Sequence, residues 1–358
     1  MRRLLILILL LFVLTGQALA VDLPETFGVA ELQRRLPQAA EEMLDGLSPT
    51  EQIDLWKLED IFTDAWEQSR GFMRMTLKSM VRILLIVILC RLAELGDGEQ
   101  VVRAAAMAGS FAITLSCAND VKGLVGLGTN TMGEIMAFSD LLLPVMASAA
   151  AAAGAAGSAG AVYALTTVFS NLLIRFCNLV LIPAVYGVIA LGLCDCALQE
   201  CRLKKAGELI SWFIRFCLKT VMYAFTGFLT VTGVISGASD AAALKAAKVT
   251  ISGMVPVVGG IISDAADTVL AGAGGLKSAV GTFGMLAIVA VFLLPFLRMG
   301  FQFLSFRLAA ALSGVMGSKL CGLLDTLAEA MGFLLAMTGS CVLMCLLSCI
   351  SFMRMVQL

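Results

Sequence analysis

The chain has 358 residues, of which 59% are hydrophobic and only 14% charged, and its mean hydropathy is +0.95. Soluble domains are about 45–50% apolar and roughly 25% charged, so this composition excludes a soluble enzyme and indicates a multi-pass membrane protein. The formal net charge is −1 and there is no histidine. The charge argues against a nucleic-acid binder, which needs a basic face, and the missing histidine excludes Ser-His-Asp catalysis and histidine-liganded metals.

Residues 1–20 have the three parts of a secretory signal peptide. Arg2 and Arg3 precede an apolar run from Leu4 to Leu14, and the small residues Ala18 and Ala20 occupy the cleavage position. The apolar run is short for a membrane helix, which takes about 20 residues. We expect cleavage here; the alternative is an uncleaved first transmembrane helix. A cleaved signal peptide and an uncleaved first helix both place the following residues outside the cytoplasm.

Residues 21–80 are more acidic than the rest of the chain and contain three of its seven prolines. Apolar residues recur there at helical spacing, as at Leu32 and Leu36, and Thr50 followed by acidic residues is typical of a helix start. The sequence predicts a small extracytoplasmic region of two or three amphipathic helices, packed on the membrane part or on a partner. The alternative is an acidic linker.

The remaining residues, 81–358, are predicted to form the transmembrane domain. Six stretches are expected to cross the bilayer: Ile83–Cys90 with its flanking arginines, Ala104–Ala118, Val162–Leu193, Leu218–Ser236, Val280–Leu297 and Ala330–Phe352. Basic residues cluster at 202–219 and 298–319, and the positive-inside rule places both clusters in the cytoplasm. This orientation requires that two further stretches, Leu141–Ala161 and Val255–Gly275, enter the membrane without crossing it.

Prolines indicate an internal repeat. Two pairs share a spacing of 39 residues and are offset by 112: Pro144 with Pro183, and Pro256 with Pro295. The copies, at about 103–200 and 215–310, are each followed by basic residues, so we expect them to run in the same direction, before a final span at 330–352. Chance could also match two prolines. A proline inside a span frees backbone groups that need protein or water partners, which favours either an interior path or a purely structural seam.

Small residues and two carboxylates complete the candidate conduit or packing residues. Ala147–Ala161 contains only Ala, Ser and Gly, which suits a buried helix that neighbours approach closely, and Gly259 has the same role in the second copy. Asp264 and Asp267 are three residues apart and share a helix face. At membrane depth such carboxylates could handle protons or cations; at the interface they would simply be hydrated.

The eleven cysteines, all at or beyond Cys90, do not form a disulfide framework. Cys194, Cys196 and Cys201 form a cluster, but without histidine it is a weak candidate for a metal site. A stripe at positions 341, 345 and 349 is predicted to be small buried hydrophobic residues. We predict no catalytic residue, metal or cofactor. No Walker loop occurs, so any ATPase activity belongs to a separate subunit.

Four short segments resemble the stage III sporulation protein AE family: Gly233–Ser236, Ala246–Lys248, Met254–Gly259 and Ser263–Val269. The similarity is specific over about 233–297 and weaker over about 71–358. The resemblance implies a multi-pass protein in the mother-cell membrane that surrounds the forespore of an endospore-forming bacterium. It implies other products of the stage III sporulation A operon as partners, and indirectly the forespore-side stage II sporulation protein Q, in a secretion-like channel. It supplies no catalytic residues.

The sequence therefore predicts an all-α polytopic membrane protein with two same-direction repeats and a small helical extracytoplasmic region. We interpret it as a non-enzymatic subunit of a mother-cell-to-forespore channel, in contact with membrane lipid and not with nucleic acid. One alternative is a self-sufficient secondary transporter that uses Asp264 and Asp267. Another is a scaffold that anchors partner subunits through residues 21–80.

Overall fold

The computed structural model describes residues 55–94, 99–150, 156–198, 201–231, 279–318 and 320–355. The helices in these ranges are α4 (Leu55–Glu94), α5 (Glu99–Ala150), α6 (Ala156–Phe176), α7 (Ile182–Leu198), α8 (Cys201–Val231), α11 (Ala279–Val315) and α12 (Cys321–Met355). A five-residue π-helix, η3 (Cys177–Leu181), joins α6 to α7 without a break. No strand occurs in these described ranges, so the predicted all-helical fold class is confirmed for them.

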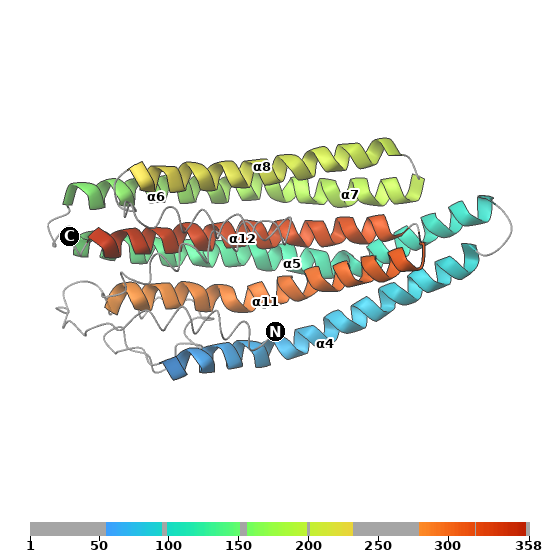
Figure 1. Ribbon diagram of the computed structural model, residues 1–358, viewed down its shortest axis with the longest axis horizontal. Coiled ribbons are helices and arrows are strands. Elements are labelled where there is room, and N and C mark those ends of the chain that lie inside the picture. Colours follow the sequence, from blue (N-terminus) through green and yellow to red (C-terminus); the bar gives the residue numbers. More distant parts are fainter. Residues whose placement is uncertain are drawn as a thin grey trace.

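The helices lie side by side in one elongated bundle, and successive helices alternate in direction (Figure 1). At one end, which we name the hairpin end, α4, α7 and α11 finish and α5, α8 and α12 begin. At the other, the open end, α5 and α8 finish and α6 and α11 begin. The α6–η3–α7 helix and α11 run in the same direction, as the predicted repeat requires, but the repeat itself stays a prediction.

The turn between α11 and α12 is set by its sequence. Gly317, at φ +68°, follows the last turn of α11, where its N–H donates to the Gly314 carbonyl, and the Ser318 N–H donates to the Ser313 carbonyl. These are the paired hydrogen bonds of a Schellman motif, which needs the left-handed conformation that glycine adopts without strain. The Leu320 N–H then donates to Ser318 Oγ at 3.3 Å. The two helices therefore fold back on each other tightly.

Helix α12 lies at the centre of the bundle and contacts α5, α6, α7, α8 and α11. Its span from Cys321 to Met353 is buried along the whole of its most apolar window, and Phe333 and Phe352 are fully enclosed. The buried hydroxyls of Ser340 and Ser348 donate to carbonyls four residues earlier in the same helix, Ala336 and Met344. These hydroxyls therefore need no water, and the middle of the described bundle is filled by protein.

Five described helices are long and apolar enough to span a membrane: Gln100–Ser148, Gly160–Leu198, Leu203–Leu229, Phe283–Val315 and Cys321–Met353. They contain five of the six predicted stretches, apart from the last residues of the fourth, which lie outside the described ranges. The first predicted stretch, Ile83–Cys90, lies in α4, which is not in this set. Basic side chains dilute its apolar core: Arg70, Arg74, Lys78, Arg82 and Arg91. Helix α4 also runs unbroken through residue 80, the predicted end of the extracytoplasmic region.

Helix α5 corrects a second expectation. The sequence predicts Ala104–Ala118 as a separate span, but one helix of 52 residues continues past the polar residues Asn119 and Asp120 to Ala150. Asp120 is accommodated because Ser79 of α4 donates a hydrogen bond of 2.9 Å to its carboxylate. Residues 141–150 are therefore the continuation of α5, not a re-entrant segment. Residues 151–155 and the second ambiguous stretch, Val255–Gly275, lie outside the described residues.

Candidate functional site

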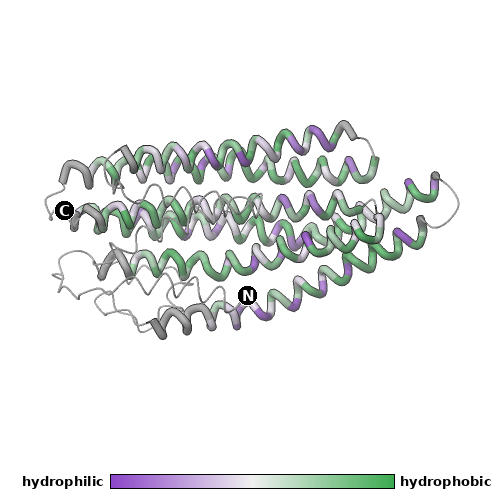
Figure 2. Tube along the Cα trace, viewed as in Figure 1, coloured by the Kyte–Doolittle hydropathy of each residue, from purple (hydrophilic) through white to green (hydrophobic). Residues whose placement is uncertain are grey.

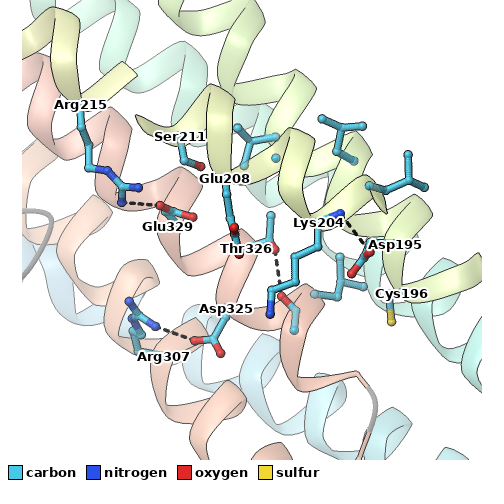
Figure 3. Close-up of a pocket in the computed structure, with 17 residues that line it drawn as sticks. Asp195, Cys196, Lys204, Glu208, Ser211, Arg215, Arg307, Asp325, Thr326 and Glu329 are labelled. Atoms are coloured by element: carbon cyan, nitrogen blue, oxygen red, sulfur yellow. Dashed lines mark hydrogen bonds and ion pairs between the residues drawn. The ribbon is translucent and has the colours of Figure 1, made fainter. Parts of the chain in front are cut away.

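A cavity of about 400 Å³ lies toward the hairpin end, between α7, α8, α11 and α12 (Figure 3). Its polar lining comes from all four helices: Asp195, Lys204, Glu208, Ser211, Arg215, Arg307, Asp325, Thr326 and Glu329. Such a concentration of charge contrasts with the open-end halves of α11 and α12, where residues 279–297 and 330–353 carry no charged side chain (Figure 2). The cavity is therefore the main polar site in the described bundle.

The rim of the cavity is formed where α7 ends and α8 begins. Asp195, in the last turn of α7, accepts a hydrogen bond of 3.1 Å from the backbone N–H of Lys204 in the first turn of α8. The first N–H groups of a helix have no partner within it and carry the positive end of its dipole. A carboxylate there satisfies one of them, so this contact fixes the geometry of the α7–α8 hairpin.

Two ion pairs connect the first turns of α12 to its neighbours. Asp325 and Glu329 are four residues apart and therefore share one face of the helix. Arg307 of α11 lies 2.5 Å from Asp325, and Arg215 of α8 lies 2.7 Å from Glu329. The Arg215 guanidinium also lies 5.8 Å from the ring centroid of Phe333, within the range of a cation–π contact. Helix α12 is thereby held on two sides at this end.

The cavity also contains groups without partners. The Ser211 hydroxyl is buried and forms no hydrogen bond, and Glu208 has no ion-pair partner within the described residues (Figure 3). No group of three or more potential metal ligands occurs in the described part of the chain. The cavity therefore offers ion pairs that join two hairpins, together with a polar lining.

The structure separates the residues that the sequence singled out. Pro144 is exposed near the end of α5, Pro183 is exposed in α7, and Pro295 is buried in α11. None of the three lines the cavity. The others lie outside the described residues: Ala18, Ala20, Pro256, Gly259, Asp264 and Asp267.

The matched prolines Pro183 and Pro295 lie in different local structures. Pro183 follows η3 directly, and the Ile182 N–H donates to the Cys177 carbonyl five residues earlier. This wider turn relieves the clash that a proline ring makes with the carbonyl four residues before it. Pro295 lies within a continuous α-helix. Pro183 is exposed and Pro295 is buried, and the expectation that both prolines mark an interior path or a packed seam stays a prediction.

The small-residue run also behaves differently from expectation. The sequence predicts that Ala147–Ala161 is buried, but its described flanks at Ser148, Gly160 and Ala161 are exposed, and a Cβ on Gly160 would meet nothing within 4 Å. Close helix contacts occur at glycines elsewhere. A Cβ on Gly192 of α7 would lie 2.6 Å from Thr326 of α12, and one on Gly284 would lie 2.6 Å from Leu142. Single glycines therefore set the close approach at these contacts between described helices.

With this geometry described, comparison with known proteins shows the family. A family model described as stage III sporulation protein AE matches residues 41–355. The chain belongs to the stage III sporulation protein AE family. The resemblance noted in the sequence is thus confirmed. The family is not a known family of enzymes, and membership implies a role in sporulation.

A curated member of the stage III sporulation protein AE family, from Bacillus subtilis (strain 168), is 25% identical to this chain over 215 residues. The match covers 60% of this chain and 53% of the relative, so it spans about half the length of that protein. No solved structure matches the chain. The helical bundle is therefore described from this structure alone.

Sequence reasoning missed the charged cavity of this family member. Arg215 and Arg307 were assigned to cytoplasmic loops, whereas both lie inside helices and pair with carboxylates of α12. The four-residue spacing of Asp325 and Glu329 was a usable indication, because carboxylates near a predicted membrane span require partners. By contrast, the prediction that Cys341, Cys345 and Cys349 are buried is confirmed.

Proposed function

We propose that this family member is a non-enzymatic integral membrane subunit of a channel complex between mother cell and forespore, required for endospore formation. The observation that carries the proposal is the filled centre of the bundle. Helix α12 is surrounded by five other helices, and its buried hydroxyls at 340, 348 and 351 donate to carbonyls of the same helix. The described helices leave no passage along this centre, which supports a passage built from more than one chain.

The proposed orientation places the hairpin end in the mother-cell cytoplasm. Lys204, Lys205 and Arg307 lie toward this end, and Arg91 and Arg103 lie near the turn between α4 and α5. Lysine and arginine in short loops favour the cytoplasmic side. This orientation also requires α4 to cross the membrane beside the five candidate spans. The residues before α4 then lie outside the cytoplasm, in agreement with the signal peptide expected at the N-terminus.

The proposed partners are other products of the stage III sporulation A operon and, through them, the forespore-side stage II sporulation protein Q. Any ATP hydrolysis that the complex uses would come from a separate subunit. The charged cavity faces the proposed cytoplasmic side, where a soluble partner has access to it.

The test combines genetics with reconstitution. Deletion of the gene should abolish heat-resistant spores, and the full-length chain supplied from another locus should restore them. The tagged protein should then co-purify with the other operon products from sporulating cells. Purified alone in liposomes, it should transport no solute. Solute transport by the isolated chain, lost on Asp264→Asn, would contradict the subunit role and favour a secondary transporter.

A further inference from the structure

One outward face of α5 is polar although this helix is long and apolar enough to span a membrane. Between Asn119 and Ser148 its exposed positions follow one another at steps of three or four residues, so they form a single face. We name these residues the polar face of α5: Asn119, Lys122, Gly123, Gly126, Asn130, Gly133, Glu134, Ala137, Asp140, Pro144 and Ser148. No large apolar side chain is exposed on α5 between these limits.

Contacts with neighbouring helices place this face beside the most apolar part of the bundle. A Cβ on Gly128 would lie 3.6 Å from Thr338 of α12 and 3.7 Å from Met299 of α11. Further along, Leu142 of α5 lies against Gly284 of α11. Residues 128–142 of α5 are thus level with 284–299 of α11 and with the charge-free segment of α12 that begins before Thr338. The polar face therefore lies at a level where its neighbours are built for a membrane interior.

The exposed face of α6 and η3 near this level is mostly apolar, although Asn171, Arg175 and Asn178 are exposed there too. The side chains of Val168, Leu172 and Leu179 in α6 and η3 are exposed. The level of this segment is set by Thr166 of α6, whose hydroxyl accepts a hydrogen bond of 3.2 Å from Ser348 of α12. Because Val168, Leu172 and Leu179 are apolar, hydrocarbon can solvate them. Hydrocarbon cannot solvate the charged side chains of the polar face in the same way.

The charges on the polar face are not neutralised within the described part of the chain. Lys122, Glu134 and Asp140 form no ion pair with any described residue. Ionised side chains at membrane depth are expensive and almost always face protein or a water-filled cavity. The centre of the described bundle is filled, so a water-filled cavity that meets these charges would lie outside it.

We propose that the polar face of α5 lines a water-filled passage enclosed between this chain and neighbouring chains of the complex. This inference rests on the proposed channel function and adds the wall of the passage to it. Gly123, Gly126 and Gly133 support it, because a Cβ on each would meet nothing within 4 Å. No packing contact among the described residues requires these glycines, and their small size leaves the passage wide.

Cysteine accessibility tests the proposal directly. Single cysteines at Asn130 and Glu134, in a full-length variant without native cysteines, would be exposed to a charged, membrane-impermeant maleimide in membranes from sporulating cells. Matched cysteines at Val168 and Leu172, which are exposed apolar positions of α6 near the same level, serve as controls. We expect reaction at 130 and 134 to be at least about tenfold faster than at 168 and 172, because a charged reagent enters hydrocarbon only at high cost. Equal labelling, or labelling of the controls alone, would overturn the proposal.

A matched pair of glycine substitutions gives an independent readout. Gly133→Leu introduces a bulky apolar side chain into the passage, whereas Gly227→Leu introduces the same side chain on the exposed surface of α8, where a Cβ also meets nothing within 4 Å. We expect Gly133→Leu to abolish heat-resistant spores and Gly227→Leu to leave their number unchanged, with both proteins at normal levels in the membrane. Normal spore numbers from both variants would overturn the proposal. If the amount of either protein falls, the labelling result decides alone.

Failure of this inference is distinguishable from failure of the proposed function. A strain without the gene that still forms normal numbers of heat-resistant spores would contradict the function itself. A strain that loses its spores, together with unlabelled cysteines at 130 and 134, would leave the function standing and overturn only the lining role. Protection from the reagent combined with crosslinking at these positions to a second protein would likewise overturn only the lining role, because the face would then be a protein interface.

Discussion

The two ion pairs on α12 have the same chemistry but different burial, and this difference predicts different contributions to stability. The side chains of Arg215 and Glu329 are 35% and 24% exposed, whereas those of Arg307 and Asp325 are 43% and 52% exposed. Exposed pairs contribute about 0.2–1 kcal/mol, while removal of one partner of a fully buried pair costs about 3–5 kcal/mol. We therefore expect a coupling free energy of about 1–2 kcal/mol for Arg215–Glu329 and about 0.5 kcal/mol for Arg307–Asp325.

A double-mutant cycle measures each coupling. The variants are Arg215→Gln, Glu329→Gln and their combination, with Arg307→Gln, Asp325→Asn and their combination as the matched set. Unfolding of the purified protein in detergent can be followed by the fluorescence of its three tryptophans. Arg215→Gln alone should lower the free energy of unfolding by up to about 1 kcal/mol more than the coupling free energy of the pair. The reason is that this substitution also removes the cation–π contact with Phe333. A coupling for Arg215–Glu329 equal to or smaller than that for Arg307–Asp325 would refute the expectation from burial.

Packing and orientation give three further predictions. Gly192→Ala should destabilise the protein by about 1–3 kcal/mol, because its Cβ would meet Thr326 at 2.6–2.9 Å. Gly227→Ala should instead stabilise it by up to about 1 kcal/mol through helix propensity. Thermal unfolding in detergent would show whether the two effects have opposite signs. Cys345→Ala should cost about 1 kcal/mol and Cys194→Ala less than about 0.5 kcal/mol, since only Cys345 is buried; chemical denaturation measures both. A cysteine at Lys205 should react with an impermeant maleimide only after mother cells are permeabilised, and labelling of intact cells would contradict the proposed orientation.

The spans were predictable from the sequence because an apolar run of membrane length has few other stable locations. Val280–Leu297 and Ala330–Phe352 both fall inside observed helices, α11 and α12. The continuity of α5 was not predictable in this way. Asn119 and Asp120 are typical of a loop, and only a partner on another helix, Ser79 of α4, makes a carboxylate acceptable there. Local pattern contains no information on such tertiary contacts.

The cavity was less accessible to sequence reasoning than the spans. Its walls come from α7, α8, α11 and α12, and Arg215 is separated from Glu329 by 114 positions in the chain. Its formation depends on Gly192, which allows α7 to approach Thr326 closely. In the sequence this glycine is one of 34 and has no neighbouring pattern to distinguish it. By contrast, the alanine run was conspicuous in the sequence, yet its described flanks are exposed.

The lengths of the helices explain how one chain can be both embedded and charged. A 52-residue helix such as α5 is about 78 Å long, and the 35 residues of α12 span about 52 Å. Hydrocarbon is only about 30 Å thick, so a large part of the bundle must extend beyond it. The charge-free segment 330–353 of α12 is long enough to fill that thickness. The first turns of α12, with Asp325 and Glu329, then lie toward the aqueous side, where water can hydrate the ion pairs at the cavity. A polar face that continues along α5 past this boundary, into the level of the charge-free segment, is not explained by helix length, and the proposed water-filled passage supplies the solvent that its charges need.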